Sequence, residues 1–243
     1  MSQTRSLAGL LISIVFMAIL CSPQALHPVL QTLFPQAGEW VFPRATLIRL
    51  TIQHLTLSLT AAGIAALIGI LLAITATRRH GRAFLRMIRD VSSLAQTIPP
   101  TAVLALAIPF LGFGYKPVLL ALVLYSILPV LNNTLTALEC LPKPILEAAQ
   151  AMGMKSLQVL FLIELPLALP AIGTGIRISA VINIGTATIA ALAGAGGLGS
   201  PIVAGLVRDN PAWVFQGAAS SALLALILNA ILLRVEVKLN PAK

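Results

Sequence analysis

Charged residues are scarce in this sequence. Only 9% of the 243 residues are Asp, Glu, Lys or Arg, against about 25% in ordinary soluble domains. Hydrophobic residues make up 58%, and the mean hydropathy is +0.97. A water-soluble globule of this length could not cover its surface with so few charges, which excludes an ordinary cytosolic enzyme and a disordered chain. The class that remains is an all-α membrane protein that crosses the bilayer several times.

Cysteines and cofactor motifs are almost absent as well. The two cysteines, Cys21 and Cys140, lie far apart without metal-ligand spacing, and we interpret them as unpaired thiols at the membrane edges. This excludes a disulfide-stapled secreted domain. The sequence has no phosphate-binding loop, no dinucleotide-binding glycine motif and no His/Cys cluster. The apolar stretches hold no paired carboxylates and no Ser/His pair, so we expect no catalytic residue, no metal site and no cofactor bound by this chain.

The hydrophobic residues gather in about six stretches, read as membrane-spanning helices. The first is short and follows Arg5, so a cleaved signal peptide is the alternative. Leu20 and Cys21 stand where a cleavage site needs small residues, which favours an uncleaved helix. In the third stretch Pro99 and Pro100 predict a kink or break, because proline lacks the backbone donor. The stretches are Leu7–Ser22, Thr56–Ala76, Ala95–Leu111, Val118–Leu138, Leu167–Ala193 and Trp213–Leu233.

The basic residues give the chain a net charge of +9 and predict its orientation. Most of the 16 lysines and arginines fall in alternate connections, as expected of loops that face the cytoplasm. The opposite side keeps only Arg44, Arg49, Lys116 and Arg208, and Arg177 falls within a span. Both termini are therefore expected in the cytoplasm. The outer segment from Pro23 to Leu50 is rich in proline and is predicted to be an ordered or partly extended loop.

The internal segment 144–166 is amphipathic. Pro144 suits the first turn of a helix, and Gly153 can end that helix with a positive φ. A second short helix is expected over 155–163, with Pro166 starting the fifth span. The segment is either a docking element for another protein or an interfacial helix that packs on the bilayer. The helical spacing places four residues on one face of the first helix: Ile145, Ala148, Ala149 and Met152.

The same segment resembles the EAA loop of ABC importer permeases, and every position of that motif is filled. The resemblance implies the transmembrane domain of a type I ABC importer, with about six transmembrane helices and a short cytoplasmic coupling helix. That helix would sit in a groove of a separate ATPase subunit, and ATP would bind to this partner. The residues implied in ATPase coupling are Glu147, Ala148, Ala149, Gly153, Ile163, Leu165 and Pro166.

Three further stretches, 96–100, 124–134 and 175–199, resemble the glycine betaine, choline and osmoprotectant permeases. The resemblance covers roughly residues 50–235. It implies an N-terminal helix and periplasmic loop over 1–50, followed by the permease domain over 51–238. It also implies a bacterial inner-membrane location and a small zwitterionic or cationic solute. The implied partners are ATPase subunits, a second permease copy or paralogue and a periplasmic substrate-binding protein, but no nucleic acid. Asn132 departs from the expected pattern, since an arginine is usual there.

Polar residues near or within the spans are candidates for the translocation path. Arg177 either reaches the cytoplasmic headgroups or lines the path, and the polar groups that follow it serve either interhelical hydrogen bonds or a hydrophilic passage. The glycine run 194–199 is interpreted as an outer gate or a plain loop, and His54 and Tyr125 as packing or interface groups. The candidates are Gln96, Thr97, Pro99, Asn133, Arg177, Asn183, Thr186 and Thr188.

Two alternatives remain for the transported solute and the energy source. Aromatic residues make up only 5% and do not cluster, although aromatic cages commonly bind quaternary ammonium groups. Selectivity is therefore expected to reside in the separate binding protein, and an amino acid or an inorganic anion is the alternative solute. An ion-coupled secondary transporter usually places carboxylates deep in the membrane. Here the carboxylates fall in loops or at span edges, which disfavours that alternative.

Overall fold

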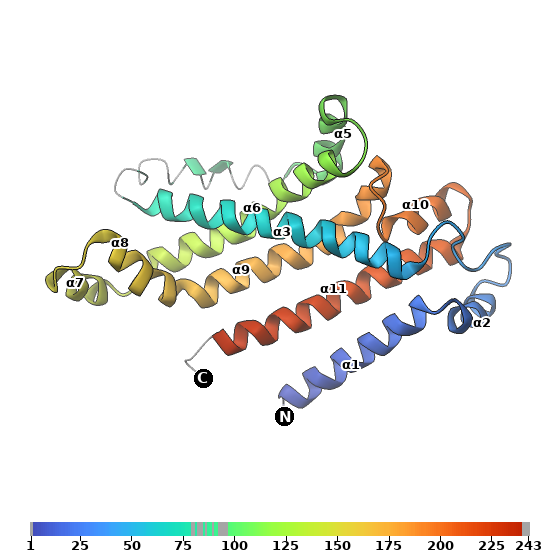
Figure 1. Ribbon diagram of the computed structural model, residues 1–243, viewed down its shortest axis with the longest axis horizontal. Coiled ribbons are helices and arrows are strands. Elements are labelled where there is room, and N and C mark those ends of the chain that lie inside the picture. Colours follow the sequence, from blue (N-terminus) through green and yellow to red (C-terminus); the bar gives the residue numbers. More distant parts are fainter. Residues whose placement is uncertain are drawn as a thin grey trace.

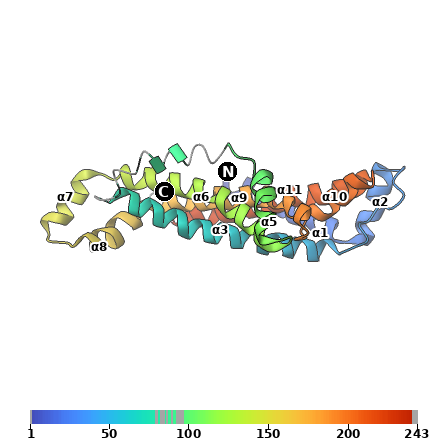
Figure 2. The ribbon, with the colours of Figure 1, turned by 90° about the horizontal axis from the view of Figure 1, so that it is seen from above.

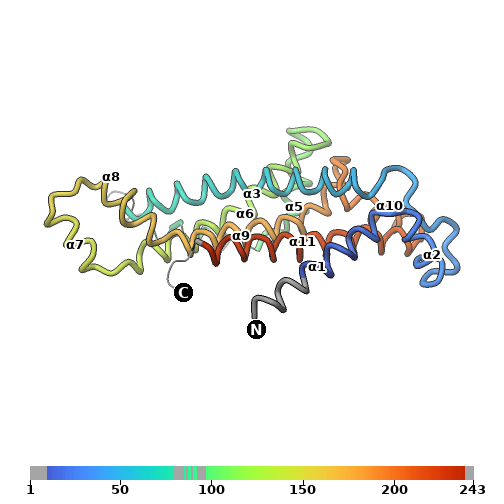
Figure 3. Tube along the Cα trace, turned by 60° about the horizontal axis from the view of Figure 1, so that its bottom comes forward, coloured from blue at the N-terminus to red at the C-terminus, as the bar shows by residue number. Residues whose placement is uncertain are grey.

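The protein is a bundle of long helices that lie along one axis. The structure, a computed structural model, describes residues 2–78, 81, 85, 87–88, 90–91 and 97–239. The described residues contain helices and no strand, which confirms the all-α expectation. Figures 1 and 3 show the long helices running along the length of the bundle. They are α1 (Ser2–Cys21), α3 (Leu47–Thr77), α6 (Tyr115–Glu139), α9 (Leu165–Thr186) and α11 (Pro211–Leu239).

The described residues contain 4 helices that are long and apolar enough to span a membrane, or up to 5 if a bent pair counts as one span. The difference from the predicted count arises at the third stretch. Its helix, α5 (Pro100–Leu111), has only 12 residues. Pro99 precedes it in an extended conformation, because the residue before a proline is pushed out of the helical region. The break predicted at Pro99 and Pro100 is therefore present, and it shortens the helix.

The segment after α1 is helical, so the loop predicted there is wrong over its first part. Helix α2 (Pro23–Leu33) begins directly after α1 and is bent from it by 89°. Pro23 lies in the first turn, where a missing backbone donor costs nothing. Leu26 and Leu30 are buried in the same apolar cluster as Trp213. Pro23 therefore marks the start of a helix and Pro28 lies inside it, whereas Pro35 and Pro43 follow it in the non-helical part of the segment.

Helices α3, α6 and α9 form the centre of the bundle, and glycines let their backbones approach closely. A Cβ atom at Gly69 of α3 would lie 3.0 Å from the Val130 Cβ of α6. A Cβ atom at Gly175 of α9 would lie 3.0 Å from the Asn133 Cβ on the same helix α6. Small residues at such contacts are typical of helix packing within membranes. Helix α6 is thus held between α3 and α9 with no room for a side chain at either contact.

The two ends of the bundle carry different short elements. Figures 1 and 2 show α7 (Lys143–Ala151) and α8 (Ser156–Val159) at one end, with α2 and α10 (Gly199–Val207) at the other. Helix α11 runs from the α10 end toward the α7–α8 end, and α1 begins on the α7–α8 side (Figure 1). The N-terminal end of α1 and the C-terminal end of α11 are therefore directed to the same side as the α7–α8 segment.

Candidate coupling elbow and membrane polar network

A helical elbow, defined here as α7, Gly153 and α8, projects at one end of the bundle (Figure 1). Helix α7 starts one residue before Pro144, which occupies its first turn. At its end Gly153 has a φ of +78°, which is the left-handed conformation that glycine adopts without strain. The backbone N–H of Met154 then donates to the carbonyl of Ala149, at 3.2 Å. The glycine turn predicted from the sequence is present and reverses the chain direction.

The second helix of the elbow differs from the prediction. A π-helical turn over Leu160–Glu164 joins α8 to α9, so the helical rod is unbroken from Ser156 to Ala193. In the π turn the N–H of Leu165 donates to the carbonyl of Leu160. The wider turn precedes Pro166, which has no N–H to offer and would crowd a regular turn. The helix predicted over 155–163 is therefore present from Ser156 onward, but the expectation that the fifth span starts at Pro166 is wrong, because the helix continues into that span without a break.

The elbow leaves most of its apolar side chains uncovered. Ala149 is buried, with 1% of its surface exposed, whereas Met152 is 74% exposed. The apolar face predicted from the sequence is therefore only partly packed against the bundle. Of the other motif residues, Glu147, Ala148, Gly153 and Pro166 are exposed, while Ile163 and Leu165 are half-buried. The large exposed apolar side chains of the elbow and the adjoining turn are Ile145, Met152, Leu157, Phe161 and Leu162.

Arg177 of α9 is held by α11. Its Nε lies 2.7 Å from a carboxylate oxygen of Glu236, and its Nη1 donates to the side-chain oxygen of Asn229 at 3.0 Å. The hydroxyl of Thr174 donates to the other oxygen of Glu236 at 2.5 Å. An intramembrane arginine is costly without such a partner. Two roles were predicted for Arg177, a contact with the lipid headgroups or a place along the translocation path. The ion pair was not predicted, because its partners are 59 residues apart in the sequence.

Asn183 is completely buried among three helices. Its Oδ1 accepts from the hydroxyl of Ser126 on α6 at 2.5 Å, and its Nδ2 donates to the carbonyl of Ser58 on α3 at 3.4 Å. Within one helix, Thr188 donates to the carbonyl of Gly185 at 2.8 Å. The two contacts of Asn183 match interhelical hydrogen bonding, which was one of the two roles predicted for it.

The other candidates for the translocation path differ in exposure and surroundings. Thr97 and Pro99 are exposed ahead of α5, and Thr186 is half-buried at the end of α9. Asn133 donates to the carbonyl of Pro129 at 2.8 Å and lines a shallow cavity of about 280 Å³. Gln96 lies outside the described residues. A path along these residues stays a prediction.

His54 is a fully buried polar residue whose role the sequence did not reveal. Its Nε2 donates to the carbonyl of Ile184 at 2.7 Å, which fixes the tautomer, because a carbonyl only accepts. Its Nδ1 accepts from the N–H of Leu198 at 3.3 Å. Nearby, Gln53 accepts from the N–H of Gly197 at 3.4 Å. His54 therefore ties α3 to α9 and to the glycine run 194–199, whose backbone packs against α3.

We expect His54→Phe to destabilise the protein by about 2–4 kcal/mol, because it strands two buried backbone groups that His54 now satisfies. Thermal unfolding of the detergent-solubilised protein measures this loss. Thr60→Val is the matched control on the same helix, since the Thr60 hydroxyl donates only to the carbonyl of Thr56 in its own helix. Equal stability of the His54 and Thr60 variants would contradict this role of the imidazole.

Comparison with known proteins identifies the architecture. Residues 65–242 match the family described as binding-protein-dependent transport system inner membrane component. The chain belongs to this family. The permease is also similar to the choline transport system permease protein OpuBB of Bacillus subtilis, with 37% identity over 89% of this chain and 96% of that protein. The osmoprotectant import permease protein OsmW of Salmonella typhimurium shares 40% identity over 79% of this chain and 91% of its own length.

A solved structure shows the same fold. The permease superposes on a chain of the MetNI methionine ABC transporter, solved in an inward-facing conformation, with a TM-score of 0.70. The match covers 80% of this chain and 96% of that chain at 21% identity. The predicted fold of a type I ABC importer transmembrane domain is thereby confirmed. The family consists of transport components, which confirms the expectation of a non-enzymatic subunit and sets aside the ion-coupled transporter.

Proposed function

We propose that this permease imports an osmoprotectant, such as glycine betaine or choline, and that the elbow couples it to a separate ATPase. The observation that carries the coupling role is the projecting elbow with its exposed apolar side chains and its left-handed turn at Gly153. An exposed apolar surface of this kind marks a contact site for a protein or for a membrane, and the match to a binding-protein-dependent transport component favours the protein. Because the sequence has no nucleotide-binding motif, the energy must come from a partner.

The relatives support the choice of solute. The similar permeases are named for choline, osmoprotectants and carnitine, with identities of 37%, 40% and 41% to this chain. Choline and carnitine share a quaternary ammonium group with glycine betaine. The few aromatic residues of the permease favour recognition of that group by a separate binding protein, with the permease as a weakly binding passage. Pairing with a second permease copy or a paralogue would complete the passage.

The arrangement of the bundle supports cytoplasmic termini. The α1 and α11 ends are directed to the elbow side. Among the described residues, that side carries Arg78, Lys143, Lys155, Arg234 and Lys238, as expected of a cytoplasmic side. An ATPase partner works in the cytoplasm, so the elbow would face it there. The location that follows is the bacterial inner membrane, with both termini inside.

The function is tested in proteoliposomes that contain the permease, its ATPase and its binding protein. We expect ATP-dependent import of radiolabelled glycine betaine or choline, and no ATP binding by the purified permease alone. Methionine and phosphate serve as the competing solutes. Import of either of these without import of any quaternary amine would contradict the osmoprotectant assignment, and ATP binding by the isolated chain would contradict the coupling scheme.

A further inference from the structure

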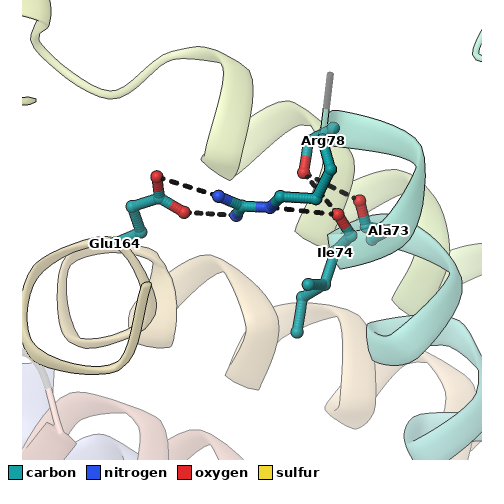
Figure 4. Close-up of polar contacts among 5 residues, drawn as sticks. Ala73, Ile74, Arg78 and Glu164 are labelled. Atoms are coloured by element: carbon teal, nitrogen blue, oxygen red, sulfur yellow. Dashed lines mark hydrogen bonds and ion pairs between the residues drawn. The ribbon is translucent and has the colours of Figure 1, made fainter. Parts of the chain in front are cut away.

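An ion pair joins the base of the elbow to the end of α3. Figure 4 shows the guanidinium of Arg78 facing the carboxylate of Glu164, with a bond to each oxygen. Arg78 Nη1 donates to Oε1 at 3.2 Å, and Nη2 donates to Oε2. Such two-pronged pairs hold both direction and distance more firmly than a single contact.

The arginine is positioned by the end of its own helix. Arg78 is the residue directly after α3, and its Nε donates to the carbonyl of Ile74 at 3.3 Å. The hydroxyl of Thr77 donates to the carbonyls of Ala73 and Ile74, at 3.1 and 2.9 Å. The Ile74 carbonyl is one of the last four of α3, which a helix end leaves without partners in the helix. The guanidinium is therefore fixed to α3 before it meets the carboxylate.

The glutamate lies at a mechanically weak point of the rod. Glu164 is the last residue of the π turn and stands two residues before Pro166. Pro166 and Pro170 remove backbone donors from the turns that follow, which makes this part of a helix easier to bend. The Glu164 side chain is only 12% exposed, and both of its carboxylate oxygens accept from Arg78. The rod could bend at the π turn before Pro166, and the ion pair connects this junction to α3.

The surroundings leave room for the elbow to move about this junction. An open cavity of about 910 Å³ lies between the elbow and the ends of α3 and α6. Arg78 and Glu164 line it, together with Leu138 of α6 and Gln150 of α7. Helix α3 has few other backbone contacts with α8 or the π turn among the described residues. Just beyond the junction, Ile70 and Ile74 of α3 pack in one apolar cluster with Leu165 and Ala168. The ion pair adds a directional polar bond to this packing.

We propose that the Arg78–Glu164 pair transmits movement of the elbow to α3, and so positions the spans for solute import when the ATPase closes. This inference rests on the proposed coupling role of the elbow. Without the pair, the elbow would still dock on the ATPase through its exposed residues. Displacement of the elbow would then bend the rod at the π turn and leave α3 in place.

The experiment measures solute imported per ATP hydrolysed in the reconstituted importer. We expect Glu164→Gln and Arg78→Gln to keep assembly and ATP hydrolysis, and to lower the import ratio about tenfold, a usual size for coupling between sites. The exchanged pair, Arg78→Glu with Glu164→Arg, should recover at least about half of the ratio, because it restores the attraction in reverse. Lys238→Gln, an exposed charge in the last turn of α11, is the control expected to match the wild type.

The outcomes separate the two proposals. Wild-type ratios in both single variants, or an exchanged pair no better than the single variants, would overturn the role of the ion pair. If the permease fails to capture the ATPase, the coupling function itself fails. Should a single variant not accumulate in the membrane, Glu164→Asp serves in its place, since it keeps the charge but shortens the reach, and an unchanged ratio in that variant would also count against the proposal.

Discussion

Replacing Gly153 with valine is expected to abolish most ATP-driven import while the protein still inserts into the membrane. The φ of +78° at this position is strained for a β-branched residue, at a cost of about 1–3 kcal/mol. No atom lies within 4 Å of the place a Cβ would occupy, so the effect comes from the backbone and not from a clash. We expect the elbow to adopt another turn and import to fall more than about tenfold, since about 1.4 kcal/mol corresponds to tenfold.

The control for this change is Gly153→Asn at the same position. Asparagine tolerates the left-handed conformation better than other residues with a side chain, so this variant should retain most import. The assay follows uptake and ATP hydrolysis together, with membrane levels from immunoblots. Continued hydrolysis with little uptake in the valine variant is the uncoupled result. Normal uptake by Gly153→Val would refute the role of the turn.

Removing Glu236 is expected to give the largest loss of stability. Glu236→Ala leaves the Arg177 guanidinium, 21% exposed, without its carboxylate between α9 and α11. Breaking a largely buried pair in this way costs about 3 kcal/mol or more, because the remaining charge is uncompensated. We expect a lower unfolding temperature in detergent and less protein in the membrane. Lys238→Ala is the control, because Lys238 lies on the same helix but is exposed.

A double replacement distinguishes lost attraction from a stranded charge. Arg177→Met combined with Glu236→Leu removes both charges and fills similar space, so most of the stability should return. Thermal unfolding of the single and double variants gives the comparison directly. A double variant less stable than Glu236→Ala would show that the polar contacts themselves, including those with Thr174 and Asn229, supply the stability.

The features that the sequence predicted are those that depend on nearby residues. The apolar stretches gave the long helices α3, α6, α9 and α11, and the spacing of α7 and Gly153 gave the turn of the elbow. Each of these follows from hydrophobic period or from the conformational preference of one residue type. Local patterns also placed the break at Pro99, although not the shortness of the helix that follows.

The features that the sequence missed depend on distant partners. Arg78 and Glu164 are 86 residues apart, and His54 meets the carbonyl of Ile184 across 130 residues. No periodicity in a single sequence brings such groups together. The continuous rod from α8 to α9 was missed for another reason. Pro166 indicated the start of a new helix, whereas a π turn before it keeps the helix continuous although proline lacks an N–H.

The close approaches at Gly69 and Gly175 also restrict how the spans can change arrangement. At these two positions the backbone of α6 faces a glycine, which has only a hydrogen in place of a side chain. Sliding α6 along either neighbour by one residue would bring side chains against that backbone. The three central helices are therefore expected to tilt as one block, with no slippage between them. An importer built in this way opens and closes its passage where these three helices contact their neighbours. A bulky substitution at either glycine would therefore hinder movement of all three helices together, and not only weaken one contact.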